Sequence, residues 1–215
     1  MTSPPNTPPL IIAIDGPSAS GKGTLAKRLA DHFGLPHLDT GLLYRAVGWL
    51  AERTGKAPAE IAASLQSSDI DNPELKTDDA GQAGSKVAAI PEVRANLLKF
   101  QKDFAYRRSG AVLDGRDIGT VICPDAPVKL FVTATLESRA ERRYRELRER
   151  GADTIKTRVL AEMAERDRRD SERAAAPLKA APDAYLLDTS DMDADAAFAA
   201  ALAFMARKGF RTAGR

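Results

Sequence analysis

The residues best suited to chemistry lie near the start of the chain, in the run Gly16-Pro-Ser-Ala-Ser-Gly-Lys-Gly-Thr24. Gly16, Gly21 and Lys22 have the spacing of a phosphate-binding loop, in which glycines let successive backbone N–H groups point at one anion. Lys22 adds a mobile positive charge, and a helix that starts there adds its dipole. Thr24 stands one position beyond the usual metal-binding hydroxyl, so we expect it to contact phosphate instead. The pattern predicts a site for a nucleoside triphosphate.

A second set of polar residues follows two other apolar runs. Asp39-Thr-Gly-Leu-Leu-Tyr-Arg45 places a hydroxyl at a helix start and an arginine one and a half turns later. This arrangement suits a second anion, although a capped helix with a surface arginine has the same pattern. Asp114-Gly-Arg-Asp117 sets an arginine between carboxylates at a strand end, which stability alone does not explain. In open parallel α/β sheets, ligands bind at the carboxyl ends of the strands. We therefore expect both groups of residues to face the phosphate-binding loop.

The segment from Glu137 to Arg173 holds twelve basic and ten acidic residues. Mixed charge at this density is typical of solvated helices with many salt bridges. Its last part, from Glu165 to Arg173, also suits a closing lid. Arginines would offset the repulsion between two phosphate-bearing substrates, and closure would exclude water.

The elements that must position these residues follow from the apolar pattern. Short apolar runs predict five strands, at residues 10–14, 35–39, 111–114, 128–133 and 184–188. Helical spacing predicts helices over 24–33, 40–55, 59–65, 85–108 with a break at Pro91, 136–150, 156–173 and 194–207. Residues 67–84 are rich in Asp, Asn, Pro and Gly, and predict an irregular excursion or flap. The alternation predicts an α/β fold, a five-stranded parallel sheet with right-handed crossovers and helices on both faces.

Composition narrows the class of protein. The 215 residues suit one domain, and 32 basic against 30 acidic residues give no global field to attract nucleic acid or a membrane. One cysteine and two histidines exclude an internal disulfide and a metal site built on these residues. Residues 1–9 carry four prolines and no apolar span, so we expect a disordered tail. We expect a cytoplasmic protein, and a monomer because no exposed apolar stripe is predicted.

The motifs together resemble those of bacterial cytidylate kinases. The resemblance includes the runs above and adds a further one, Ser85-Lys-Val-Ala-Ala-Ile-Pro-Glu-Val-Arg94. It also extends the run that starts at Asp114 to Thr120, and the run that starts at Glu165 to Leu178. In all, the resemblance spans residues 10–188. It implies one P-loop kinase domain over residues 10–212, with a core at 10–55, 109–136 and 184–210, a small region that binds the nucleoside monophosphate at 56–108, and an arginine-rich helical lid at 137–173. It also implies phosphoryl transfer from ATP to CMP or dCMP with Mg²⁺.

The resemblance assigns roles to the matching positions. The ATP-binding residues would be Gly16, Pro17, Ser18, Ala19, Ser20, Gly21, Lys22, Gly23 and Thr24. The CMP-binding residues would be Thr40, Tyr44, Arg45, Ser85, Arg94, Arg116, Asp117, Arg166, Asp170 and Arg173. Among them, Ser85, Arg94 and Asp117 would read the cytosine edge, Arg166 and Asp170 the sugar, and Thr40, Arg45, Arg116 and Arg173 the acceptor phosphate. Lys22, Arg116 and Arg173 would be catalytic, by neutralising charge without a general base. No direct Mg²⁺ ligand is assigned. Phosphates and water would hold the ion, near Thr24 and Asp39.

The sequence departs from the family in two places. Ala19 stands where the loop often has glycine, and the part between Arg45 and Ser85 is short, which predicts that its small antiparallel sheet is trimmed or absent. The lid arginines that would contact ATP are assigned by position alone, from the set Arg139, Arg142, Arg143 and Arg150.

Three other interpretations stay open at this point. One is another P-loop kinase that acts on a different monophosphate or a sugar-like acid, against which Ser85, Arg94 and Asp117 argue. A second is a nucleotide switch or nucleic-acid binder, against which interleaved acids and the lack of an aromatic platform argue. The third, an inactive relative, would require broken motifs.

Overall fold

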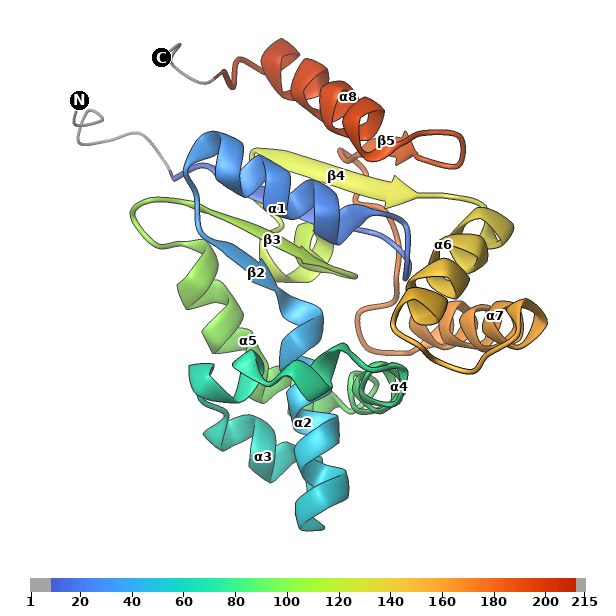
Figure 1. The fold of residues 1–215 in the computed structure, drawn as a ribbon. Helices are drawn as coiled ribbons and strands as arrows, with labels where there is room; N and C mark the ends of the chain where they lie inside the picture. The colour runs from blue at the N-terminus through green and yellow to red at the C-terminus, as the bar shows by residue number, and fades with distance from the viewer. Residues whose placement is uncertain (1–8, 212–215) are drawn as a thin grey trace.

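The computed structural model describes residues 9–211, and this part of the chain holds one five-stranded sheet in which every pairing is parallel. The strand order is β2-β3-β1-β4-β5 (Figure 1). The strands are β1 Ile11–Asp15, β2 His37–Asp39, β3 Ala111–Gly115, β4 Val128–Thr133 and β5 Tyr185–Asp188. The predicted α/β fold and all five strands are confirmed.

Helices cover both faces of the sheet because the central strand is apolar on both sides. Ile11 and Ala13 of β1 belong to one buried cluster, and Ile12 and Ile14 belong to another on the opposite face. On the first face lie α2 (Thr40–Thr54), α3 (Pro58–Ser64) and α5 (Pro91–Ala105), and on the second α1 (Lys22–Phe33) and α8 (Ala194–Arg207) (Figure 1). The break predicted at Pro91 is the first residue of α5.

Residues 67–84 are more regular than the sequence predicts. Two short 3₁₀ helices, η1 Ser67–Asp71 and η2 Pro73–Lys76, lead into helix α4, Asp78–Val87, so this helix begins at Asp78 and not at Ser85. Thr77 caps it by accepting a hydrogen bond from the Ala80 backbone N at 3.3 Å. Helices and turns occupy residues 46–84, all of which are described, and no strand lies among them.

Helix α4 packs closely on α2 because both helices carry small residues at the contact. A Cβ atom built on Gly84 would lie 2.9 Å from the backbone nitrogen of Arg45, and one on Gly48 would lie 2.7 Å from the carbonyl carbon of Ala83. These distances are too short for any side chain. The close packing brings Ser85 of α4 to the same cavity as Arg45 of α2.

Two charged helices form a unit of their own. Helix α6, Leu136–Glu149, and helix α7, Lys156–Glu172, pack through Ala140, Leu147, Val159 and Met163. Figure 1 shows the pair beyond the carboxyl end of β4, apart from the two layers on the sheet. The bounds of α6 and α7 agree with those of the two helices predicted at residues 136–150 and 156–173.

The predicted tail, residues 1–9, lies outside the described residues except for Pro9, and so does residue 212. Between residues 9 and 211, none of the helices combines the length and the apolar character that crossing a bilayer requires.

Candidate active site

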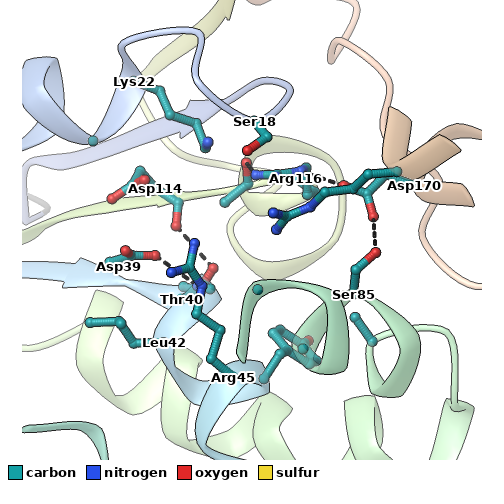
Figure 2. Close-up of a pocket in the computed structure, with 18 of the residues that line it drawn as sticks. Ser18, Lys22, Asp39, Thr40, Leu42, Arg45, Ser85, Asp114, Arg116 and Asp170 are labelled. Atoms are coloured by element: carbon teal, nitrogen blue, oxygen red, sulfur yellow. Dashed lines mark hydrogen bonds and ion pairs between the residues drawn. The ribbon is translucent and has the colours of Figure 1, made fainter. Parts of the chain in front are cut away.

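The largest concentration of charged side chains lines a cavity at the carboxyl ends of β1, β2 and β3. Figure 2 shows Lys22 and Ser18 on one side of it, Arg45 and Ser85 on the other, and Arg116 and Asp170 between them. We name it the acceptor cavity. All ten residues assigned to CMP line it, namely Thr40, Tyr44, Arg45, Ser85, Arg94, Arg116, Asp117, Arg166, Asp170 and Arg173.

The phosphate-binding loop separates this cavity from a second one. Ser18, Ala19, Lys22 and Gly23 line the acceptor cavity, whereas Ser20, Gly21 and Thr24 line the second cavity. The rest of the second wall comes from α1, β4, α6, the β5–α8 connection and the start of α8. These residues are Leu25, Val132, Arg142, Thr189, Met192, Asp193, Ala194 and Ala197. Two ligands can therefore approach the loop from different sides.

Gly16 and Pro17, the other two loop residues assigned to ATP, line neither cavity. Gly16 has φ of 153°, and a Cβ built there would lie 2.0 Å from the Val132 carbonyl oxygen. Only glycine fits. Ala19 is left-handed, with φ of 57°, which explains the usual glycine at this place, because an L-residue there carries strain.

Lys22 is poised beside the acceptor cavity with its charge destabilised. Its Nζ donates to the Pro17 carbonyl oxygen at 3.1 Å. Burial, and next the positive charge of Arg116, lower the Lys22 pKa to about 7. An anion bound at the loop would reverse this effect, because it supplies the negative charge that the lysine lacks.

Asp15, the last residue of β1, ties the loop to the segment after β3. Its carboxylate accepts hydrogen bonds from the backbone nitrogens of Ile118 at 2.7 Å and Gly119 at 2.8 Å. These residues open a single π-helical turn, Ile118–Ile122. Burial raises the Asp15 pKa to about 7, against the lowering effect of those two N–H groups. Asp15 therefore fixes the backbone that follows Asp117.

Carboxylates pair with several of the cavity's arginines. Arg116 Nε donates to Asp170 Oδ2 at 2.8 Å, and Arg94 Nη2 pairs with Asp117 Oδ2. Burial favours a higher pKa for Asp170, but Arg116 and then Arg166 outweigh it and hold the Asp170 pKa below its usual range. The Asp170 carboxylate is therefore ionised at neutral pH.

Other arginine nitrogens make no hydrogen bond in the described part of the chain, although one of them, Arg173 Nη2, lies 3.8 Å from Asp117 Oδ1. Within residues 9–211, three buried guanidinium atoms have no hydrogen-bond partner, namely Arg45 Nε, Arg166 Nε and Arg173 Nη2. Burial, and next Arg116, lower the Arg166 pKa to about 10, so this side chain stays charged. Buried unpaired donors are costly, and three cationic ones around one cavity fit an anion with several oxygens.

Thr40 and Asp39 fix the start of α2. Thr40 Oγ1 donates to the Asp114 carbonyl oxygen at 2.9 Å, and Asp39 Oδ1 accepts from the Gly41 backbone N at 2.9 Å. The Thr40 proton is thus engaged with the backbone and is not directed at the cavity. Burial, and next Asp114, raise the Asp39 pKa.

All four lid-region arginines that were sought as ATP contacts have partners in the protein, and Arg150 donates to the Lys76 carbonyl oxygen at 2.9 Å. Arg139 is buried and donates to the carbonyl oxygens of Ala134 at 2.9 Å and Ser18 at 3.2 Å, and Arg142 donates to Thr189 Oγ1 at 3.0 Å. Arg143 lines the acceptor cavity and pairs with Asp78 at 2.7 Å. Arg139 thus supports the phosphate-binding loop through its backbone.

Two contacts beside the cavity, made by Asp15 and Arg169, were not assigned a role from the sequence. Asp15 stands at a strand end beside the loop, and that position was a usable signal for its role. Arg169 donates to Ser85 Oγ at 3.1 Å, whereas Arg168 beside it pairs with Glu165 and Glu172. Nothing in the sequence separates these two arginines.

A parallel sheet with a phosphate-binding loop after its first strand, and an arginine-lined cavity beside that loop, defines the class of P-loop kinases. The family profile described as cytidylate kinase matches residues 12–207. The chain belongs to the cytidylate kinase family.

Individual relatives are similar in sequence to this protein over nearly its whole chain. A cytidylate kinase of Paramagnetospirillum magneticum is 58% identical over 207 residues, which cover 92% of this chain and 98% of that protein. One of Xanthobacter autotrophicus is 59% identical over 201 residues, which cover 91% and 97%. A crystal structure of an uncharacterized protein from Eubacterium ventriosum aligns with a TM-score of 0.55 at 19% identity, covering 94% of this chain and 99% of that one. This last likeness concerns the fold alone.

Proposed function

We propose that the protein transfers the terminal phosphoryl group of ATP to CMP and dCMP, and releases ADP with CDP or dCDP. The observation that carries the proposal is the pair of cavities on the two sides of the phosphate-binding loop, one of which gathers every residue assigned to CMP. Family membership supports the same reaction.

ATP would lie with its phosphates on the loop and its nucleoside in the second cavity. The apolar part of that cavity, with Val132, Met192 and Ala197, suits an aromatic base. CMP would lie in the acceptor cavity, its phosphate held by Arg45, Arg116 and Arg173. Arg45 Nε and Arg173 Nη2, which make no hydrogen bond within residues 9–211, support this placement, because the phosphate would accept from both.

The base would be read at the far side of the acceptor cavity. Arg94 and Asp117 form a donor and acceptor pair, and Ser85 adds a hydroxyl. Cytosine presents an amino donor next to ring and carbonyl acceptors, so such a set favours it over uracil, whose edge is reversed. Arg166 and Asp170 would contact the sugar.

Catalysis in this proposal needs positioning and charge neutralisation. The attacking oxygen of a nucleotide monophosphate is already anionic at neutral pH, so no general base is required. Lys22, Arg116 and Arg173 would offset the charge that two phosphates bring together in the acceptor cavity. These residues also hold the two substrates in line.

Mg²⁺ fits the site only as an ion held by substrate. Within residues 9–211, no group of three or more His, Cys, Asp or Glu residues could hold a metal ion. Asp39 lines the acceptor cavity and Thr24 the second one. In this proposal they would contact water molecules around such an ion from the two sides of the loop. When bound, Mg²⁺ would neutralise charge on the phosphates of ATP.

We further propose that residues 10–212 act as one domain in which residues 56–108 bind the monophosphate and residues 137–173 form the lid. The contacts of Arg143 with Asp78 and of Arg169 with Ser85, between these two regions, support this division. A cytoplasmic monomer is the form we propose. The cytoplasm supplies the ATP that the proposed reaction consumes. Its reducing conditions also suit a chain with a single cysteine, which has no internal disulfide to form.

The test is a coupled assay of ADP release with ATP and Mg²⁺, in which CMP, dCMP, UMP and AMP are offered separately. We expect strong turnover with CMP and dCMP and little with UMP or AMP. Turnover with UMP or AMP above that with CMP would assign the protein to another monophosphate. If no ADP is released with any of the four acceptors, the proposed reaction is contradicted.

A further inference from the structure

The hydroxyl group of Ser85 lies between two charged side chains of α7. Its Oγ is 3.1 Å from Asp170 Oδ1 and 3.1 Å from Arg169 Nη1. The contact between Ser85 and Asp170 is visible in Figure 2. Ser85 and Asp170 line the acceptor cavity, whereas Arg169 is not part of its wall. Arg169 can therefore influence a ligand in the cavity only through its neighbours.

These two neighbours determine where the hydroxyl proton points. A guanidinium group only donates hydrogen bonds, and an ionised carboxylate only accepts them. The Ser85 proton must therefore point at Asp170, and one lone pair of Ser85 Oγ is taken by Arg169. A hydroxyl oxygen has two lone pairs, so one remains. Toward the cavity Ser85 can only accept a hydrogen bond.

Arg169 is itself held in place, which makes this polarity a fixed feature of the site. Its Nη1 also donates to Gln82 Oε1 of α4 at 3.4 Å, and its Nη2 lies 3.7 Å from Glu165 Oε1 one turn earlier on α7. Only about a quarter of its side chain is exposed, at 24%. Arg169 thus connects the base-reading end of α4 to the lid.

We infer that Arg169 is a positioning residue that keeps Ser85 a hydrogen-bond acceptor toward the cavity, and so favours a pyrimidine with an amino group over one with a carbonyl at that place. The inference rests on the proposed function, because it takes CMP and UMP as the competing ligands. Arg169 and Asp170 together hold the Ser85 oxygen from two sides. Without Arg169 only Asp170 would hold it, so the side chain could rotate away from Asp170 and present its proton to the uracil carbonyl. Arg94 and Asp117 would still discriminate, so the loss of specificity would be partial.

The experiment measures kcat/KM for CMP and for UMP in Arg169→Met. We expect the ratio of the two values to fall about tenfold, the size of one hydrogen bond, with most of the change in UMP. Arg169→Lys keeps a donor and should retain most of the ratio. Arg168→Met is the matched control, since this exposed neighbour pairs only with Glu165 and Glu172 and should leave the ratio unchanged.

A second background separates positioning from a general structural effect. In Ser85→Ala, which has no hydroxyl to orient, adding Arg169→Met should leave the ratio where Ser85→Ala put it. If Arg169→Met fails to fold, Arg169→Ala, with less apolar surface, takes its place. An unchanged ratio in a folded Arg169 variant, or an equal fall in the Ser85→Ala background, would overturn the inference. Failure of the unmodified protein to phosphorylate CMP would instead contradict the proposed function.

Discussion

Lys22 links the phosphate-binding loop to pH, because its pKa of about 7 leaves it largely neutral at pH 8. A bound triphosphate restores the charge, so ATP binding at pH 8 should be accompanied by net proton uptake. The sign follows from the lowered pKa. The protonated lysine is scarce in the empty protein above pH 7, so ATP affinity should fall as pH rises from 7 toward the ordinary lysine value of 10.5.

Calorimetry in two buffers of different ionisation enthalpy measures this uptake directly. Lys22→Arg should abolish it, since a guanidinium stays charged. Lys27→Met, a change at an exposed lysine of the same helix, should preserve it. Equal heats in both buffers for the unmodified protein would mean that Lys22 is already charged before ATP arrives.

At the scale of single residues, sequence could identify chemical types but not partners. Every residue assigned to CMP lines one cavity, because strand ends and spacing determine which side chains converge. Arg168 and Arg169 have the same type and neighbouring positions, and only the packing of α7 against α4 decides which of them reaches Ser85. Arg139 was sought as an ATP contact by position alone, and the sequence did not display its partners, which are the backbone oxygens of Ala134 and Ser18 and the Asp167 carboxylate.

The contact between α2 and α4 is the element on which the acceptor cavity depends most directly. Gly84→Ala would place a Cβ 2.9 Å from the Arg45 backbone nitrogen, so the helices must separate. We expect a loss of about 1–3 kcal/mol in the free energy of unfolding, measured by urea denaturation. The KM for CMP should rise more than the KM for ATP, because Ser85 and Arg45 move apart while the loop stays.

Gly81→Ala is the control for that experiment, since it gives α4 the same gain in helix propensity. Its Cβ would meet only the end of the flexible Arg166 side chain, at 3.3 Å. If the two variants are equally stable, close packing of α2 and α4 is not what requires glycine at position 84.

At the scale of elements, the strands and most helices were predictable because their apolar periodicity is strong. Helix α4 was the exception. Its Gly81, Gly84 and two leading aspartates indicate a loop by composition, whereas the structure uses the glycines for close packing and the aspartates in a capped first turn. Local propensity was overruled by a tertiary contact that the sequence does not display.

Across the whole molecule, residues 137–173 and residues 56–108, which we propose as the lid and the monophosphate-binding region, are joined by the ion pair between Arg143 and Asp78. Asp78→Asn should lower kcat/KM for CMP about two- to fivefold, the range of a partly exposed ion pair. The effect should shrink as salt is added, because the pair is screened. Steady-state kinetics at low and high salt measure both quantities.

Asp79→Asn serves as the comparison, since Asp79 shares the first turn of α4 and its dipole but has no ion pair in the described part of the chain. Its kinetics should match those of the unmodified protein. A salt-independent deficit in Asp78→Asn, or the same deficit in Asp79→Asn, would assign the effect to the start of the helix and not to the contact between the regions.

The order of strands in the sheet has a consequence for how the protein is made. The phosphate-binding loop leaves the ribosome early, yet β1 pairs only with β3 and β4, and β2 pairs only with β3. The two earliest strands therefore have no partner until residues 111–115 have been synthesised. During translation the nascent chain must keep the apolar Ile11–Asp15 segment from self-association until then. The nucleotide sites can form only when the strand that separates the first two has arrived.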